Sequence, residues 1–409
     1  MSTPTTMVQL STIDLAQLYG LLQPIIVSHT SSNAKFANWS ETFTCSPLAI
    51  FEPETEYHCE LILELARREG RVVRAVGVGH SPSDLACTTG YMLRTTKLNR
   101  LLEIHADKRY VIAQAGITLD ALHSELSSNG LAMINVGSIS DQTLGGIVTT
   151  ATHGTGINYG VISTHVMGLT LLLADGSRVF CSRHERPDLF IASICGLGST
   201  GLILTVTLEV EPAFRLKEVQ QTIGFHECVR SLDSLVTASE HVRFWWFPAA
   251  DTMRIFSADR TAEPAKPVGS WLWDSFFGFH VVQFLLFAAS TKVIVIDESF
   301  RIFNLDCRYQ QHTTEWAIPY QNTKACLRDL HDWMTHELSD PQGLRPHWPI
   351  EVRFSDSDDI WLSPSNGRKT CWIGIVQFKP YGFDVPYKKL FERFEAILFS
   401  HGGRPHWAK

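Results

Sequence analysis

The sequence predicts an α+β protein with two domains. Its 409 residues exceed the length at which a single hydrophobic core stops growing. Apolar residues make up 44% of the chain and charged residues 19%, which is typical of a globular protein. Before Pro212, strand patterns mix with helical ones around three glycine-rich turns, whereas the later strands are rich in aromatic residues. We therefore expect a first domain of small mixed sheets that carries a ligand site, then a domain built on an antiparallel sheet.

The first domain follows a Ser/Thr-rich N-terminal extension over residues 1–42. A helix is predicted over 54–70, because Pro53 precedes it and Gly70 ends it. A strand of β-branched residues then runs into a glycine turn. Further along, the patterns predict hairpins over 101–113 and 166–181, a helix over 119–129 and a strand over 203–210 that Pro212 ends.

The first glycine turn reads Gly77-Val78-Gly79-His80-Ser81. Glycine lets the backbone turn sharply and approach a ligand that a Cβ would block. Such a turn can offer several backbone N–H groups to a pyrophosphate. His80 would face the same ligand, and an imidazole is nucleophilic enough to bond covalently to an electrophilic cofactor. On spacing alone, a histidine that only hydrogen-bonds a carbonyl is the commoner alternative.

A second loop, over residues 137–156, holds five glycines within 20 residues. It is neither a Walker loop nor a Rossmann fingerprint, since no Gly-Lys-Ser/Thr follows and no apolar strand leads into the glycines. Its backbone donors and hydroxyls can wrap around a bulky, planar and phosphorylated ligand. A third small-residue turn ends at Gly201, so one extended ligand is predicted. The candidate binding residues here are Gly137, Ser138, Gly145, Gly146, Thr149, His153, Gly154, Thr155, Gly156 and Gly201.

The second domain is predicted to have strands over 243–247, 349–354 and 371–378 and a helix over 323–337. Residues 271–290 are apolar and aromatic, but Asp274, His280 and Gln283 interrupt them. A buried or interfacial helix therefore suits this segment better than a membrane span, and attachment to a membrane surface stays open.

Charge and cysteine content exclude several functions. The net charge of −7 argues against a nucleic-acid binder, which needs a basic face. The nine cysteines are scattered without metal-ligand spacing, so we expect free thiols, a reducing compartment and no metal site. The N-terminus lacks the pattern of a secretory signal.

Glu351 and Arg353 lie two residues apart in a predicted strand, so their side chains should share one face. Without further information, an exposed ion pair worth under about 1 kcal/mol is the simpler interpretation.

Three stretches together resemble a known family: Val76 to Ser83, the loop up to Gly156, and Gly402 to Lys409. They are similar to the aldonolactone oxidoreductases of the vanillyl-alcohol oxidase flavoprotein superfamily, with the fungal D-arabinono-1,4-lactone oxidases first and the animal L-gulonolactone oxidases next. The resemblance implies a two-subdomain PCMH-type FAD-binding domain over 43–213 and a substrate (cap) domain over 214–409. It also implies that His80 carries the FAD covalently.

The same resemblance implies residue roles. Glu351 and Arg353 match the catalytic Glu-x-Arg, which would act on the C2 hydroxyl of an aldono-1,4-lactone while hydride passes to flavin N5. Lys409 matches a lysine placed near flavin N1. Gly137 matches a position where plant dehydrogenases carry alanine, and the missing methyl would let O2 reach the flavin and form H2O2. The implied product is an ascorbate-like compound of the D-erythroascorbate type.

Alternatives remain open. They are an alditol or sugar oxidase of the same superfamily, a cytochrome c-linked lactone dehydrogenase, against which His80 and Gly137 argue, and a flavin-binding protein without turnover. Family chains usually continue for some tens of residues beyond the position of Lys409, so impaired turnover is expected of this chain. The family further implies an intracellular protein associated with mitochondrial membranes.

Overall fold

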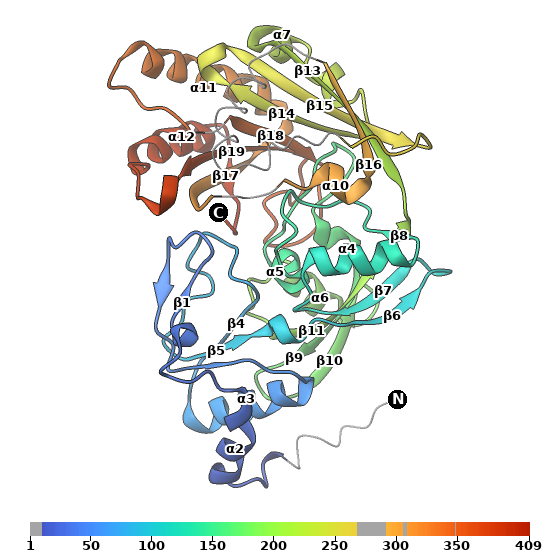
Figure 1. The fold of residues 1–409 in the computed structure, drawn as a ribbon, viewed down its shortest axis with the longest axis vertical. Helices are drawn as coiled ribbons and strands as arrows, with labels where there is room; N and C mark the ends of the chain where they lie inside the picture. Colours follow the sequence, from blue (N-terminus) through green and yellow to red (C-terminus); the bar gives the residue numbers. More distant parts are fainter. Residues whose placement is uncertain (1–9, 268–291, 306–308, 348) are drawn as a thin grey trace.

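The computed structural model describes residues 10–267, 292–305, 309–347 and 349–409. They form two parts, with the N-terminal half of the chain at one end and the C-terminal half at the other (Figure 1). The fold class is the α+β arrangement expected from the sequence. The apolar segment 271–290 lies outside the described residues. Within the described ranges, no helix has the length and apolar character that crossing a bilayer requires.

The first subdomain is built on a three-stranded parallel sheet. Its order is β3 (Ala49–Phe51), β5 (Tyr91–Arg94) and β4 (Val73–Val76). The predicted helix over 54–70 is confirmed as α3 (Glu56–Glu69): the Thr55 hydroxyl accepts a hydrogen bond from the His58 N–H, and Gly70 ends the helix at φ 62°. Strand β4 leads directly into the predicted glycine turn.

The N-terminal extension belongs to the core of this subdomain. Helix α2 (Leu15–Leu22) buries Leu18 and Leu22 in the same cluster as α3. Farther on, β1 (Phe36–Ala37) pairs antiparallel with β2 (Thr44–Cys45). The loop between these strands carries Trp39, whose backbone N–H donates to the Gly79 carbonyl. The extension therefore reaches the glycine turn.

The second subdomain holds a five-stranded antiparallel sheet. Its order is β10 (Arg178–Ser182), β9 (Val166–Leu172), β11 (Leu202–Glu209), β7 (Tyr110–Gln114) and β6 (Leu101–His105), which confirms both predicted hairpins. Three helices join it: α4 (Leu119–Ser128), α5 (Leu144–Thr149) and α6 (Pro187–Ser193).

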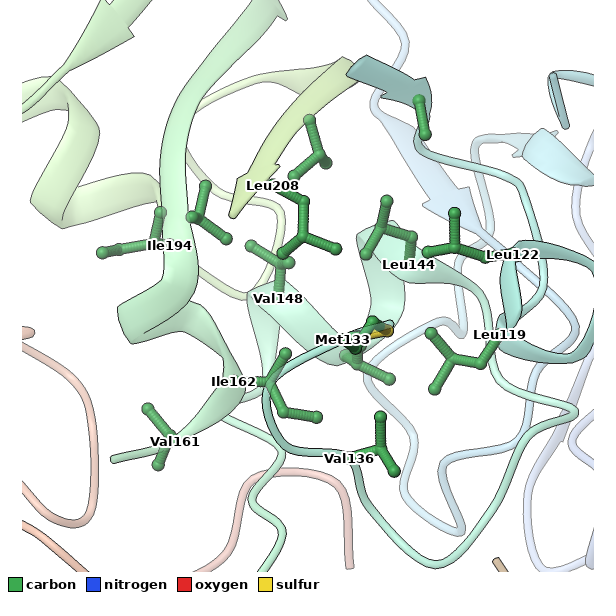
Figure 2. Packing of buried hydrophobic residues seen from close by; sticks show 14 of the residues in the cluster. Leu119, Leu122, Met133, Val136, Leu144, Val148, Val161, Ile162, Ile194 and Leu208 are labelled. Atoms are coloured by element: carbon green, nitrogen blue, oxygen red, sulfur yellow. The ribbon is translucent and has the colours of Figure 1, made fainter. Parts of the chain in front are cut away.

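Helix α5 lies inside the second glycine loop, where its apolar side chains fix the loop to the core. Leu144, Ile147 and Val148 are fully buried or nearly so. Figure 2 shows Leu144 and Val148 packed among the surrounding apolar side chains. The glycines of the loop are therefore held in place rather than free.

The second domain is an eight-stranded antiparallel sheet. In order across the sheet, its strands are β16 (Val293–Glu298), β13 (Arg215–Gly224), β15 (Thr252–Thr261), β14 (His241–Phe247), β18 (Ile350–Ser355), β19 (Thr370–Phe378), β17 (Gln311–Pro319) and β20 (Arg404–Pro405). The helices are α7 (Phe225–Arg230), α8 (Leu232–Val236), α10 (Ser299–Phe303), α11 (Thr323–Ser339) and α12 (Lys388–Ser400). Two strands, β8 (Leu131–Ala132) and β12 (Glu211–Pro212), pair at the junction of the domains.

The two faces of this sheet differ because side chains alternate along each strand. Phe244, Val352 and Ile373 lie on the face that packs with α11 and α12, in one apolar cluster. Their neighbours, Glu351 and Arg353 among them, lie on the opposite face. That face is turned toward the first domain (Figure 1). The fold thus presents polar side chains of the second domain to the glycine turns of the first.

Candidate active site

A cleft runs between the two subdomains of the first domain and brings the three glycine turns together. Of the residues predicted to bind a ligand, Gly77, Val78, Gly79, His80, Ser81, Gly145, Gly146, Thr149 and Gly201 line it. Gln142, Thr143, Thr150, Thr152 and Leu197 also line it, although the sequence did not single them out. An extended ligand, as predicted, would touch all three turns.

Two glycines of the first turn are required by geometry. A Cβ on Gly77 would lie 2.1 Å from Thr143 Oγ1, which no side chain can do without moving its neighbour. Gly79 has a φ of +70°, in the left-handed region that favours glycine. The first turn can therefore lie against Thr143, at the start of α5, only because Gly77 lacks a side chain.

His80 lies where this cleft meets a second cavity, because it lines both. Its ring stacks on Trp39 with 4.6 Å between centroids and an interplanar angle of 11°. Within the described part of the chain, His80 Nε2 is buried and has no hydrogen-bond partner. Burial, aided by the Lys409 ammonium, lowers the pKa of His80 to about 4. His80 is therefore a neutral imidazole with one nitrogen that has no partner in the described ranges, which is the state a nucleophile needs.

The second cavity lies between the two domains. The predicted residues Gly137, Ser138, His153, Arg353 and Lys409 line it with Trp39, Glu315 and His406. The Leu305 N–H donates to the Ser138 carbonyl at 2.6 Å, so the second glycine loop is tied to the other domain here. First-domain and second-domain residues thus share one cavity beside His80.

Glu351 and Arg353 form the expected pair on one face of β18. The Arg353 guanidinium donates to Glu351 Oε2, and Trp245 Nε1 donates to Glu351 Oε1 at 3.4 Å. Burial alone would raise the pKa of Glu351, but the Arg353 charge holds it below its ordinary value. Arg353 Nε is buried without a hydrogen-bond partner in the ranges described. The pair therefore offers an ionised carboxylate and a guanidinium nitrogen with no internal partner.

A second acid, Glu315, lies on the same face of the sheet. Strand pairing places Glu351 opposite Gly374, and Gly374 opposite Glu315. Since glycine has no side chain, the Glu315 side chain can lie over Gly374, where a Cβ would be 3.4 Å from Glu315 Cβ and Cγ. The site was predicted to contain one carboxylate, whereas the structure places two there.

Glu315 is buried beside the nitrogen atoms of His153 and Lys409. His153 Nε2 lies 3.2 Å from Glu315 Oε1, and Lys409 Nζ lies 3.7 Å from Glu315 Oε2. Burial alone would raise the pKa of Glu315, but His153 and Lys409 hold it well below its ordinary value. Glu315 is therefore a carboxylate at neutral pH.

His406 is the remaining buried base of this cavity. Burial lowers its pKa to about 3, so it is neutral at physiological pH. Ligand atoms of His153, Glu315 and His406 lie within 4.8 Å of one another. The ammonium of Lys409 and the guanidinium of Arg353 would repel a metal cation at this point, so we interpret the cluster as a hydrogen-bonded charge network.

Four predicted residues line neither cavity: Glu351, Gly154, Thr155 and Gly156. Glu351 lies next to the second cavity through its pairing with Arg353. Gly154 packs against Asn135 and Val136, whereas Thr155 and Gly156 join the second glycine loop to the second domain. Thr155 Oγ1 donates to the Val242 carbonyl, and the Gly156 N–H donates to the Phe354 carbonyl at 2.9 Å. A glycine-rich stretch does not reveal whether its backbone approaches a ligand or another strand, so the sequence assigned them to the ligand.

Sequence reasoning also missed Glu315 and Trp39. Glu315 was assigned no role, and Trp39 lies within the N-terminal extension over 1–42. The alternation of residues 311–319 would have put Glu315 on one face of a strand. Nothing in the sequence shows which other strands that face meets.

Comparison with known proteins identifies the chain as a flavin-dependent oxidoreductase. The model of the FAD binding domain matches residues 47–182. The model of D-arabinono-1,4-lactone oxidase matches residues 206–294 and 287–409. The chain belongs to this family of FAD-linked oxidases, as the resemblance implied.

Known relatives cover nearly the whole chain. L-gulonolactone oxidase of Scyliorhinus torazame is 39% identical over 394 residues, which are 92% of this chain and 89% of the relative. L-gulonolactone oxidase of Mus musculus is 38% identical over 400 residues, covering 93% and 90%. D-arabinono-1,4-lactone oxidase of Eremothecium gossypii is 30% identical over 456 residues, covering 95% and 86%. The animal enzymes are thus more similar than this fungal one, the reverse of the order expected from the motifs.

Solved structures support the fold. A solvent-stable cholesterol oxidase has a TM-score of 0.75 at 20% identity, covering 92% of this chain and 86% of that one. Cholesterol oxidase from Brevibacterium sterolicum, as a His121Ala mutant, has a TM-score of 0.76 at 16% identity, covering 94% and 89%. These likenesses show the same arrangement of an FAD-binding domain and a large antiparallel sheet.

Proposed function

We propose that this protein oxidises an aldono-1,4-lactone at its C2 hydroxyl, with FAD as the cofactor and O2 as the electron acceptor. The observation that carries the proposal is the position of His80. It joins the glycine-lined cleft to the cavity that holds Arg353, Glu315 and Lys409. A ligand that fills the cleft would therefore present one end to these charged groups.

The residues of the cleft fit FAD. The glycine turns would bring backbone N–H groups to the pyrophosphate, and Gly77 can lie this close to Thr143 only because it has no Cβ. At the other end, the buried Nε2 of His80 has no hydrogen-bond partner in the described ranges, as expected of an atom that is completed by a cofactor. When bound, FAD supplies a hydride acceptor at N5 and reoxidation by O2, which gives H2O2.

The pair on β18 would act on the substrate. Glu351 is ionised and can accept the C2 hydroxyl proton as hydride leaves the carbon. Arg353 Nε, buried without an internal partner in the described ranges, can donate to the oxygen as negative charge grows there. The oxidised carbon loses two electrons and two hydrogens, one as the proton held by Glu351 and one as the hydride. A 2-keto lactone results and tautomerises to an ascorbate-like enediol.

His80 is proposed to hold the flavin covalently, through a bond from its imidazole to the 8α methyl carbon of the flavin. The N–C bond would replace one hydrogen of the imidazole and one of the flavin methyl group, and O2 would take up the two electrons and two protons as H2O2. The neutral state of His80 and its stacking on Trp39 support this role, because they present a fixed, unprotonated nitrogen.

The similarities favour two substrates over others. The relatives named above act on L-gulonolactone or D-arabinono-1,4-lactone, and the higher identity to the L-gulonolactone oxidases supports the six-carbon lactone as the better substrate. The five-carbon lactone, first expected from the motifs, is the alternative.

The test combines cofactor and turnover. Purified protein is precipitated with acid; a yellow pellet shows attached flavin, and H2O2 release is then measured with L-gulono-1,4-lactone, D-arabinono-1,4-lactone and an alditol. Lactone-dependent H2O2 supports the proposal. Oxidation of the alditol alone, or electron transfer to cytochrome c without H2O2, would replace it with one of the alternatives. Membrane association is tested separately by co-sedimentation with vesicles.

A further inference from the structure

Glu315 is the second acid of the cavity, and the structure gives its carboxylate two cationic neighbours. It lies on β17 and only 5% of its surface is exposed. His153 comes from the second glycine loop and Lys409 from the residues after β20. Three separate parts of the chain thus meet at one buried carboxylate.

The hydrogen bonds of His153 define its protonation. Its Nδ1 lies 2.9 Å from the Gly154 carbonyl oxygen, which can only accept, so Nδ1 carries a hydrogen. Its Nε2 lies 3.2 Å from Glu315 Oε1. Lys409 on the other carboxylate oxygen favours the ionised form of Glu315, and an ionised carboxylate at this distance would attract a hydrogen on Nε2 as well. A histidine that donates from both nitrogens is an imidazolium.

The environment of the ring suits a cation. His153 stacks on Trp372, with 3.9 Å between centroids and an interplanar angle of 12°. An aromatic face attracts positive charge. The Trp372 indole N–H donates to Ser355 Oγ at 2.8 Å, which fixes the indole beneath the ring.

His406, by contrast, is held neutral. Its Nδ1 accepts a hydrogen bond from the Ala408 N–H at 3.0 Å, so that nitrogen carries no hydrogen. The His406 N–H donates to the Glu315 carbonyl at 2.9 Å. The residue that carries the carboxylate therefore also fixes the backbone three residues before Lys409.

We propose that Glu315 is a positioning residue that keeps His153 doubly protonated and directs the Lys409 ammonium toward His80. One carboxylate then holds two cations, and their excess positive charge faces the cavity. We assign the reduced flavin next to His80 as the anion that this charge stabilises. This assignment rests on the proposed function. Charged and titratable groups that face Glu315 are His153, His406, Lys409, Arg353 and Glu351.

The direct test reads the protonation of His153. Flavin-loaded protein is labelled with ¹⁵N in its histidine rings, and His153→Gln assigns the signals. We expect both ring nitrogens of His153 to be protonated at about pH 7.5. In Glu315→Gln, whose amide can donate to Nε2, the ring should become neutral, with one unprotonated nitrogen. Glu395→Gln is the matched control. Glu395 lies on α12 and accepts a hydrogen bond from Thr314 Oγ1 at 2.7 Å, on the opposite, apolar face of β17.

A wild-type spectrum in which His153 has one unprotonated nitrogen overturns the proposal, and so does an unchanged ring in Glu315→Gln. Since this readout needs no substrate, it stands even if lactone oxidation is not observed. A kinetic arm follows where turnover exists: Glu315→Gln should lower kcat by about 10²-fold with a smaller change in KM, the size typical of losing one preorganised electrostatic contact. Glu315→Asp, which keeps the charge, should recover part of the loss.

Discussion

Glu351 and Glu315 face the same side of the sheet from strands two apart, with Gly374 in register between them. Each carboxylate has its own cationic partner, Arg353 for the first and Lys409 for the second. Gly374 therefore lies between two separately neutralised acids. A small polyhydroxylated molecule could hydrogen-bond to both.

Gly374→Ala tests whether the substrate binds between Glu351 and Glu315. The added Cβ would lie 3.4 Å from Glu315 Cβ and Cγ, an ordinary contact, so the protein should fold. We expect KM for the lactones to rise roughly 10-fold, and more for the six-carbon than for the five-carbon lactone, because one misplaced methylene-sized group costs about 1–3 kcal/mol in a pocket. Gly20→Ala, where nothing lies within 4 Å of the new Cβ, is the control. Equal KM values for the variant and the parent would place the substrate elsewhere.

Trp39→Ala should lower the fraction of covalently attached flavin, because His80 loses the ring on which it stacks. The loop that carries Trp39 is also held by Lys379, whose Nζ donates to the Ser40 carbonyl at 3.2 Å, so the loop should stay in place. Attachment is measured as flavin absorbance retained by denatured protein. Trp39→Phe should keep most of it, whereas His80→Ala should abolish it. Full attachment in Trp39→Ala would mean that His80 is oriented by other contacts.

Gly137→Ala should slow the reaction of the reduced flavin with O2 while hydride transfer from the lactone continues. Gly137 lines the cavity beside His80, and its new Cβ would lie 3.2 Å from Thr152 Cγ2. A methyl group there narrows the approach to the flavin. Stopped-flow reoxidation at several O2 concentrations measures the effect, with Gly224→Ala as the control in open space. Unchanged O2 reactivity would remove the argument for Gly137 as an O2 path.

Gly154→Ala should destabilise the protein rather than alter flavin binding. A Cβ there would lie 2.1 Å from Asn135 Oδ1 and 2.6 Å from the Val136 carbonyl oxygen, so the backbone must shift. Overpacking of this kind typically costs about 1–3 kcal/mol. Urea unfolding with flavin content recorded in parallel separates the two effects. A variant of normal stability that loses FAD would instead show that Gly154 contributes to the cofactor site.

Stability should fall as the pH drops from about 6.5 toward 4, partly through His123. Burial lowers the pKa of this histidine to about 4, whereas an unfolded chain has a value of about 6.5. Between these values the unfolded chain binds more protons, so unfolding becomes easier as the pH falls. At about 1.4 kcal/mol per unit, the contribution is on the order of 2–3 kcal/mol.

His123→Phe checks this pH dependence, since a phenyl ring can keep the stack on Phe300 without titrating. Urea unfolding at about pH 7.5 and pH 5 should show a smaller loss of stability in the variant than in the parent. The same loss in both would assign the pH dependence to other buried groups, such as His80 and His406.

Patterns within single elements were predictable. The strand period placed Glu351 and Arg353 on one face, and Gly70 predicted the end of the helix over 54–70, although the N-cap is Thr55 rather than a residue next to Pro53. The family motifs predicted that His80 and Lys409 belong to the same site. Each of these needs only local spacing or a motif.

Relations between distant elements were not predictable from the same patterns. Glu315 meets His153 through a strand register and a domain contact that no local spacing encodes. The same holds for Gly154 to Gly156, whose composition suits a ligand loop and a strand contact equally. Trp39 was missed because a short loop next to a Ser/Thr-rich stretch carries no periodic signal.

The division of the site between two halves of the chain has a consequence for its biogenesis. His80 belongs to the half that leaves the ribosome first, and Arg353 to the half that follows. Since domains generally fold as units in the order of synthesis, the nascent polypeptide could take up its nucleotide before the hydroxyl-oxidising groups have arrived. Peroxide production would then begin only with a fully made molecule.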